Sequence, residues 1–280
     1  DGRGHRLLDQ VDIRGTGAQR RFPDGTPLDL NGTYRVVVNS FLAAGGDNFT
    51  ELAKGTRKVD TGKIDLQSMV DWFAANRVAS PDLAQRQVGV KATTPNATGE
   101  PLTVNLSSLE FSAGETKAGT VNVRVGGADL GTVAIDPTIV DTTDEVGRAT
   151  LVAQVPGSVY GQQNLVITTP TGTNITQPVF LKAPSTITAR DIERFARAGR
   201  SYQVKAAVQA PIAITGTVGV AVDGVQVGEF AYTPRRGATS MEATVVLPAT
   251  LAKGAHTVTL TYNGSSTLLT STTSFAITVR

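Results

Sequence analysis

The sequence predicts a mainly β protein, with an α+β segment at its start and two all-β sandwiches of similar length after it. Two observations predict the β part. From about residue 93 onward, strand-like runs of about 5–8 residues alternate with Gly, Pro and Asp-Gly turns, and this region repeats itself. The first 92 residues instead combine a β-branched run with one apolar helical period.

The repeat is clearest in a pair of predicted hairpins. Residues 119–131 and 216–228 both read as a strand, a two-residue turn containing Gly, and a second strand. The two copies lie about 93–97 residues apart, which is the size of one β-sandwich, and the boundary between them falls near residues 183–185. Residues 93–99 have the composition of a linker. The expected domains are therefore 1–92, 93–184 and 185–280.

The first domain contains two predicted strands and one predicted helix. Residues 34–38 are mostly β-branched and predict a buried strand, and residues 7–13 alternate well enough for another. Asp65 is a suitable N-cap for a helix that fades by about residue 77, and Trp72 is expected at the edge of the core. The apolar face of this helix is expected to consist of Leu66, Met69, Val70 and Phe73.

Composition limits the chemistry that the chain can perform. The 280 residues carry 26 Lys and Arg against 24 Asp and Glu, a balance too even to indicate nucleic acid or an anionic membrane as an obligatory partner. The absence of Cys excludes disulfides, thiolate metal sites and a Cys nucleophile. With only two His, a His-rich metal cluster or a Ser-His-Asp triad is nearly excluded. No apolar run approaches the ~20 residues of a membrane span.

Several polar positions have a functional alternative beside the solvated surface role that we expect for them. His5 has carboxylates nearby that could complete a metal pair, and His256 lies at the start of a predicted strand. The acidic run 141–145 could hold Ca²⁺ through clustered oxygens but lacks the spacing of an EF-hand loop. The arginines of 190–200 and 235–236 could contact nucleic acid or wall polymers.

A family resemblance is carried by residues 34–49. Their sequence, Tyr-Arg-Val-Val-Val-Asn-Ser-Phe-Leu-Ala-Ala-Gly-Gly-Asp-Asn-Phe, resembles the C-terminal domain of the bacterial and animal 5′-nucleotidase family. Residues 25–33 look like the family's approach to this strand, and residues 59–65 look like its approach to the last helix. The members of this family are two-domain metallophosphoesterases. The resemblance covers only the latter part of their C-terminal domain.

The resemblance implies that this loop binds the nucleoside part of a nucleotide. Phe41 would stack on one face of the base, where stacking is worth about 1–3 kcal/mol. The Asp47 carboxylate would accept hydrogen bonds from the ribose hydroxyls, and Gly45 and Gly46 would let the backbone approach the ligand. On the residues alone, Phe41 could instead belong to the core, the two glycines could form a tight turn, and Asp47 could cap the turn that follows.

The resemblance also implies chemistry outside this chain. The family's preceding domain holds two divalent metal ions that activate water to attack phosphorus, and its ligand motifs are missing from residues 1–280, as are a second stacking aromatic and an arginine cluster for phosphates. We therefore expect no cofactor, metal ion or catalytic residue in this chain, and no phosphohydrolase activity from it alone. The two metal ions are expected in the N-terminal domain of a longer parent protein.

The two C-terminal repeats resemble bacterial Ig-like domains, most closely in residues 251–264. Together the resemblances imply the C-terminal part of a secreted or cell-surface bacterial 5′-nucleotidase-like hydrolase of extracellular nucleotides, with the sandwiches as spacers. The expected partners are a nucleotide or nucleoside and the cell wall, and nucleic acid only if the parent carries a nuclease domain. The alternative is an adhesive or structural Ig-like stalk without a catalytic role. A carbohydrate-binding module is disfavoured because residues 93–280 contain no Trp.

Overall fold

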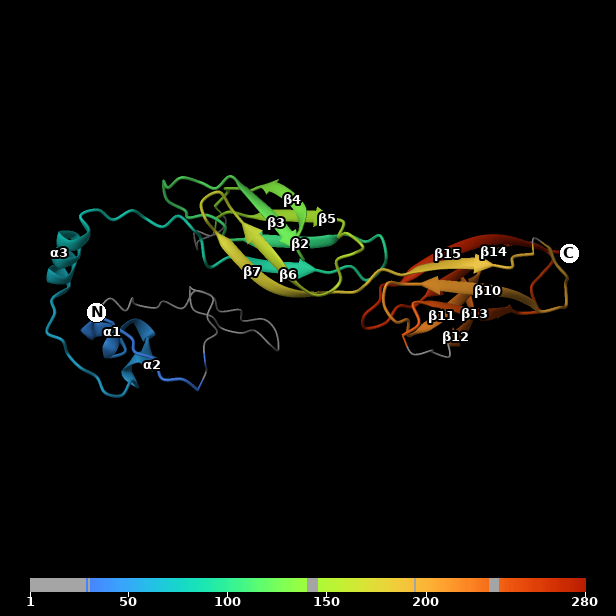
Figure 1. Ribbon diagram of the computed structural model, residues 1–280, viewed down its shortest axis with the longest axis horizontal. Helices are drawn as coiled ribbons and strands as arrows, with labels where there is room; N and C mark the ends of the chain where they lie inside the picture. The colour runs from blue at the N-terminus through green and yellow to red at the C-terminus, as the bar shows by residue number, and fades with distance from the viewer. Residues whose placement is uncertain (1–28, 30, 140–145, 194, 232–236) are drawn as a thin grey trace. The chain divides into compact units, whose positions relative to one another are not determined.

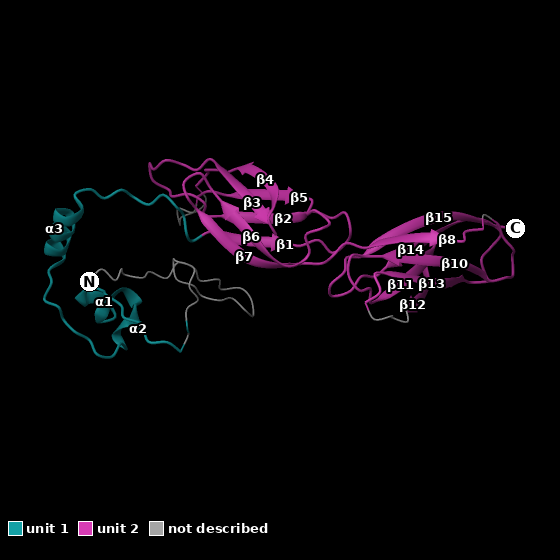
Figure 2. Ribbon diagram, in the orientation of Figure 1, with its two compact units in different colours: residues 1–87 teal, residues 88–280 magenta. Residues whose placement is uncertain are grey.

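Most of the regular structure of the chain is β-sheet, in agreement with the predicted fold class (Figure 1). In a computed structural model, the described residues are 29, 31–139, 146–193, 195–231 and 237–280. The chain divides into two units, Asp1–Gln87 and Val88–Arg280, which Figure 2 colours separately.

The described residues of the first sandwich of the Val88–Arg280 unit form seven strands in two sheets. One sheet has the order β1-β2-β5 and the other has the order β4-β3-β6-β7, with antiparallel pairing throughout. This two-sheet arrangement is shared with immunoglobulin-like sandwiches. The strands are β1 (Gly89–Thr93), β2 (Leu102–Ser107), β3 (Thr120–Val125), β4 (Ala128–Ala134), β5 (Ala149–Ala153), β6 (Gly161–Thr168) and β7 (Asn174–Leu181).

The second sandwich repeats this topology strand for strand. Its sheets have the orders β8-β10-β13 and β12-β11-β14-β15-β9. Among the described residues, the one strand without a counterpart in the first sandwich is β9, a two-residue strand that pairs parallel with β15. The strands are β8 (Thr186–Arg190), β9 (Phe195–Ala196), β10 (Tyr202–Gln209), β11 (Thr217–Val222), β12 (Val225–Ala231), β13 (Ser240–Leu247), β14 (Gly254–Tyr262) and β15 (Ser271–Val279).

Both predicted hairpins are present, as β3–β4 and β11–β12. Their turns are Gly126-Gly127 and Asp223-Gly224, and all four residues have positive φ, which glycine and aspartate tolerate better than most residues. Each hairpin also has a register shift two residues before the end of its first strand. Turn chemistry therefore fixes the same local geometry in both copies.

Each sandwich has its own apolar core, built from the inward positions of alternating strands. β2, for example, buries Leu102, Val104 and Leu106 while the residues between them are more exposed. In the second sandwich the largest fully buried side chain is Tyr262, whose hydroxyl donates to the carbonyl oxygen of Thr215. A buried phenol without such a partner would be costly.

In the Asp1–Gln87 unit, the predicted helix is confirmed as α3 (Asp65–Asn76). It begins one residue earlier than expected, because Ile64 occupies the N-cap position and Asp65 is the first helical residue, with its carboxylate accepting the Leu66 N–H at 2.7 Å. The other helices are short: α1 (Ser40–Ala43), the 3₁₀ turn η1 (Gly46–Asn48) and α2 (Thr50–Ala53). Among the described residues, no helix combines the length and apolarity that crossing a membrane requires.

The buried strand predicted for residues 34–38 is wrong. These residues have no strand conformation, and Val37 is 76 % exposed. The Tyr34 hydroxyl instead donates to the carbonyl oxygen of Asp29 at 2.9 Å, which closes a local loop. A strand needs a partner ladder, and among the described residues of this unit none is present. The predicted strand 7–13 lies outside the described residues.

The apolar face of α3 is also exposed, contrary to the expectation of a core. Trp72 is 46 % exposed and packs edge-on against Phe73, with the ring centroids 5.1 Å apart. The helix forms from its local pattern, whereas burial of its apolar face depends on a partner surface.

One further expectation needs correction. Residue 93 ends β1, and the following residues join β1 to β2 within the first sandwich, so the expected linker 93–99 is a loop of that sandwich. The arginine-rich stretch 190–200 has no helix among its described residues and contains β9. His5 and the polar runs 141–145 and 235–236 lie outside the described residues.

Candidate functional site

The segment that carries the nucleotidase resemblance folds into three short helical turns. Asn39 is the N-cap of α1, and its Oδ1 accepts the Leu42 N–H at 2.8 Å and so satisfies one of the free donors of the first turn. Ala44 is the C-cap of α1, and the Gly45 N–H donates to the carbonyl oxygen of Leu42 at 2.9 Å. The chain then enters the Gly45–Asp47 turn.

This turn depends on its two glycines for different reasons. Gly45 has φ +90°, a conformation that residues with a side chain rarely adopt. At Gly46 the constraint is space, since a Cβ there would lie 2.5 Å from Cε1 and Cζ of Phe41. Asp47 itself has φ +50°, in the left-handed region that Asp tolerates better than most residues.

Phe41 therefore lies directly over the backbone of Gly46 while its ring remains 57 % exposed. Asp47 is exposed and follows Gly46 immediately. The structure thus brings all four predicted site residues into one loop, with a flat aromatic ring and a carboxylate both open to solvent. The alternative that Phe41 is a core residue does not describe its surroundings among the described residues.

Two residues of the loop were missed by sequence reasoning. Phe49 is a second exposed aromatic side chain, 56 % exposed, two residues after Asp47. The Lys58 ammonium donates to the carbonyl oxygens of Ala43 at 3.2 Å and Ala53 at 2.7 Å, which are the last residues of α1 and α2. Lys58 thereby holds the two short helices together, and no local sequence signal indicates a contact over this separation.

Two groups of the loop have chemistry that could contact a ligand. An exposed ring can stack on a base, and a carboxylate can accept from the two hydroxyls of a diol. Within the described ranges, no three His, Asp or Glu side chains lie close enough together to hold a metal ion.

His256 lies in a different setting from the surface position predicted for it. Its side chain is only 12 % exposed, its Nδ1 lies 2.7 Å from the Asp223 carboxylate, and its Nε2 lies 2.8 Å from the carbonyl oxygen of Ala252. Both partners are acceptors, so both ring nitrogens must donate, which only the protonated imidazolium can do. The Ala252 carbonyl and then the Asp223 carboxylate raise the pKa of His256 above its ordinary 6.5.

We expect this pair to make the stability of the second sandwich depend on pH. Because the folded pKa of His256 is raised, its charge-dependent contribution is fully present below pH 6.5 and is lost as pH rises through the folded pKa. The pKa of Asp223 is lowered, first by the Thr257 N–H and then by His256, so protonation of Asp223 intervenes only at much lower pH. Urea unfolding of wild type and His256→Gln between about pH 5 and about pH 9 measures the difference. A stability difference that grows with rising pH would contradict the assignment.

Comparison with solved structures gives weak likenesses for the β part. A structure of fibronectin(III)-like modules of Clostridium thermocellum CbhA covers 69 % of this chain and 94 % of its own, at 16 % identity and a TM-score of 0.30.

Comparison of sequences gives relatives that match part of the chain. A 5′-nucleotidase from Diplobatis ommata is 35 % identical over 80 residues, which are 28 % of this chain and 14 % of that protein. A 5′-nucleotidase from Vibrio cholerae is 40 % identical over 52 residues, which are 19 % of this chain and 9 % of that protein. The chain thus spans a small part of the length of these relatives. Residues 9–54, which include the whole Phe41–Asp47 loop, match the family model described as 5′-nucleotidase, C-terminal domain.

Proposed function

We propose that the loop around Phe41 and Asp47 binds the base and ribose of a nucleotide, as part of a 5′-nucleotidase-like hydrolase. Phe41 stacks on the base, Asp47 accepts from the ribose hydroxyls, and Gly45 and Gly46 keep the backbone close to the ligand. The observation that carries the proposal is the exposed Phe41 ring held over Gly46, next to Asp47, inside the stretch that matches the nucleotidase family model.

The proposal places the hydrolytic chemistry in another part of a longer parent protein. There, two divalent metal ions would activate the water that attacks phosphorus. The two sandwiches of this chain act as spacers, and the parent is secreted or held at a bacterial cell surface, where it hydrolyses extracellular nucleotides. The cell wall is then a further partner. The competing function is a structural or adhesive stalk, in which the loop binds no nucleoside.

Exposed apolar side chains in the first unit support a larger parent domain. The face of α3 and residues 34–38 leave many large apolar groups open to solvent, which is unusual for the surface of a complete folded domain. We infer that the remainder of the nucleotidase C-terminal domain covers them. The apolar residues concerned are Tyr34, Val36, Val37, Leu66, Met69, Val70 and Phe73.

Adenosine binding to the 280-residue chain tests the proposal. Chemical shifts of the amides of residues 41–49 are followed as adenosine is added to wild type and to Phe41→Ala. Loss of a stacking contact of about 1–3 kcal/mol is expected to weaken binding by about 5- to 150-fold. Phe180→Ala is the matched control, because Phe180 is also exposed, at 45 %, but lies on β7. Equal binding by wild type and Phe41→Ala would contradict the role of Phe41.

Gly46→Ala gives a second test that leaves the Phe41 side chain in place. A Cβ at position 46 displaces the ring, so adenosine binding should fall nearly as much as in Phe41→Ala. Gly114→Ala is its control, because a Cβ there meets nothing within 4 Å. The same samples are expected to release no phosphate from AMP with added divalent metal ions. Wild type that binds no adenosine although the loop is folded would favour the stalk.

A further inference from the structure

Within the Val88–Arg280 unit, the two sandwiches are connected by more than the covalent chain. Three connections meet: residues 96–98 between β1 and β2, residues 183–185 between β7 and β8, and residues 267–270 between β14 and β15. We name this region the joint. The first connection belongs to one sandwich, the third belongs to the other, and residues 183–185 are the covalent link.

The backbone of residues 267–270 lies between the other two segments of the joint as a strand would. On one side, the Thr98 N–H donates to the carbonyl oxygen of Thr270 at 2.8 Å, and the Thr270 N–H donates to that of Asn96 at 3.0 Å. On the other side, the Ala183 N–H donates to the carbonyl oxygen of Thr267 at 2.8 Å, and the Leu269 N–H donates to the carbonyl oxygen of Ala183 at 2.9 Å. Both contacts are parallel β-bridges.

Two hydroxyl side chains complete the joint from within. Ser185 is 1 % exposed, and its Oγ donates to the carbonyl oxygen of Leu269 and lies 2.8 Å from Ser271 Oγ. Thr98 Oγ1 donates to the carbonyl oxygen of Ser185 at 2.9 Å and accepts the Ser185 N–H at 3.2 Å. A buried hydroxyl with several partners is specific for one arrangement, because any other arrangement leaves polar groups unpaired.

Apolar packing crosses the joint as well. Ala183 and Leu268 are both fully buried, and both belong to the core cluster of the second sandwich. Tyr160, from the β5–β6 connection of the first sandwich, packs against the same cluster. The core of the second sandwich is therefore contacted by Tyr160 of the first sandwich and includes Ala183 of the covalent link.

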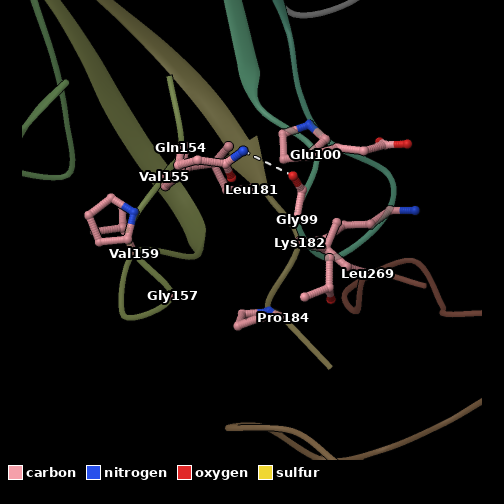
Figure 3. A pocket seen from close by; sticks show the side chains of 13 residues that line it. Gly99, Glu100, Gln154, Val155, Gly157, Val159, Leu181, Lys182, Pro184 and Leu269 are labelled. Atoms are coloured by element: carbon pink, nitrogen blue, oxygen red, sulfur yellow. Dashed lines mark hydrogen bonds between the residues drawn. The ribbon is translucent and has the colours of Figure 1, made fainter. Parts of the chain in front are cut away.

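The first sandwich in turn holds its side of the joint in place. Gln154 Nε2 donates to the carbonyl oxygen of Gly99 at 2.9 Å, next to Thr98 (Figure 3). The Glu100 carboxylate accepts the N–H groups of Asn96 at 2.9 Å and Ala97 at 3.1 Å. A cavity of about 230 Å³ remains beside the joint, lined in part by Thr98, Pro184 and Leu269. The β1–β2 loop, which contacts Thr270 of the second sandwich, is thus also held by hydrogen bonds within the first sandwich.

The corresponding connection of the second sandwich behaves differently. Between β8 and β10 the chain forms β9, which pairs with β15 of the same sandwich at Thr278 and Val279. The connection between β1 and β2 instead pairs with Thr270 of the neighbouring sandwich. The joint is therefore a specific feature of this pair and is not produced by the repeat itself.

We propose that the joint makes the two sandwiches one rigid body, which moves as a unit. Modules joined by a short exposed linker normally move relative to one another. Here such motion would break the backbone pairs at Thr270 and Leu269 and would expose Ser185 and Leu268. The proposal deepens the spacer role proposed above, because it makes the spacer one of fixed geometry. Its test measures rigidity and no nucleotide binding, so either proposal can fail without the other.

Residual dipolar couplings of backbone amides in the 280-residue chain test the proposal directly. Couplings from strands β1–β7 and from strands β8–β15 are expected to fit one common alignment tensor. The amides of Ala183, Leu269 and Thr270 should exchange with solvent at least about 100-fold more slowly than unprotected amides. Two different alignment tensors, or joint amides that exchange at the unprotected rate, would overturn the proposal.

A pair of double variants tests which groups hold the joint. Thr98→Val with Ser185→Ala removes the hydroxyl groups of the joint at nearly constant volume. It is expected to speed exchange of the Leu269 and Thr270 amides at least about tenfold and to separate the two alignment tensors. The matched control is Thr272→Val with Ser274→Ala, which removes cross-strand hydroxyl contacts of β15 outside the joint. Equal effects of the two double variants would contradict a specific role for the joint hydroxyls.

Discussion

Replacing Gly147 by alanine is expected to lower the free energy of unfolding of the first sandwich by about 2–5 kcal/mol. Gly147 has φ +86°, so any side chain is strained there. In addition, the new Cβ would lie 2.7 Å from the backbone nitrogen of Glu110 and 3.0 Å from that of Leu109. Backbone atoms cannot rotate away as the end of a side chain can.

The backbone at Gly147 is hydrogen-bonded to the same segment that the new Cβ would contact. The two segments therefore have little freedom to move apart and relieve the clash. The Leu109 N–H donates to the carbonyl oxygen of Gly147 at 3.0 Å, and the Glu110 N–H donates to that of Val146 at 3.4 Å. Glu110 is itself only 6 % exposed, and its Oε1 accepts the Gly119 N–H at 2.9 Å. Moving this segment would therefore disturb a buried carboxylate.

Gly127→Ala is the matched control. Gly127 has nearly the same φ, +85°, but a Cβ there meets nothing within 4 Å. The Gly127→Ala variant is expected to lose only the free energy of conformational strain, about 1–2 kcal/mol. Urea unfolding followed by circular dichroism, with amide signals of the first sandwich as a local probe, compares the two variants. Equal losses would show that conformational strain, and not the clash with the backbone, sets the cost.

Leu260→Ala is expected to lower the free energy of unfolding of the second sandwich by about 2–5 kcal/mol. Leu260 is 0 % exposed on the central strand β14, within the core cluster that also contains Val220 and Tyr262. The truncation removes buried apolar contacts and leaves a cavity that paired strands on both sides of β14 cannot close.

The neighbouring variant Thr259→Ala is its control. Thr259 points to the other face of β14, where its hydroxyl makes a 2.9 Å contact with Ser274. Loss of this exposed contact should cost less than about 1 kcal/mol. Urea unfolding of both variants, read from amide signals of the second sandwich, gives the comparison. A loss at Leu260 no greater than that at Thr259 would contradict the position of the core.

The features that sequence reasoning predicted are those set by neighbouring residues. The hairpin turns at Gly126-Gly127 and Asp223-Gly224 follow from residues that accept positive φ. The helix Asp65–Asn76 follows from its apolar period and the absence of a breaker until Pro81. These signals do not depend on what the segment packs against.

The features that were missed depend on distant residues. The exposure of residues 34–38 could not be read from their composition, because a β-branched run is buried only where a partner covers it. His256 contacts the carboxylate of Asp223, thirty-three positions away in the sequence. Thr98 is hydrogen-bonded to Ser185, from which it is separated in the sequence by most of the first sandwich. Pairs of this kind are set by topology, which a single sequence does not contain.

The candidate site divides in the same way. Phe41, Gly45, Gly46 and Asp47 were predicted from a continuous motif, and the structure places them in α1, in the turn after it and in η1. That a Cβ at position 46 would meet the Phe41 ring, and that Lys58 contacts the last residues of both α1 and α2, emerged only from side-chain contacts.

The open apolar face of α3 determines how the isolated chain behaves in a concentrated solution. The exposed side chains of Leu66, Met69 and Phe73 form an apolar surface on which a second chain can associate. The formal charge of +2 gives little electrostatic repulsion between chains. Sulfate or phosphate strengthens apolar association because these ions are excluded from protein surfaces. Precipitants of this type are therefore expected to drive the chains together through the exposed face of α3.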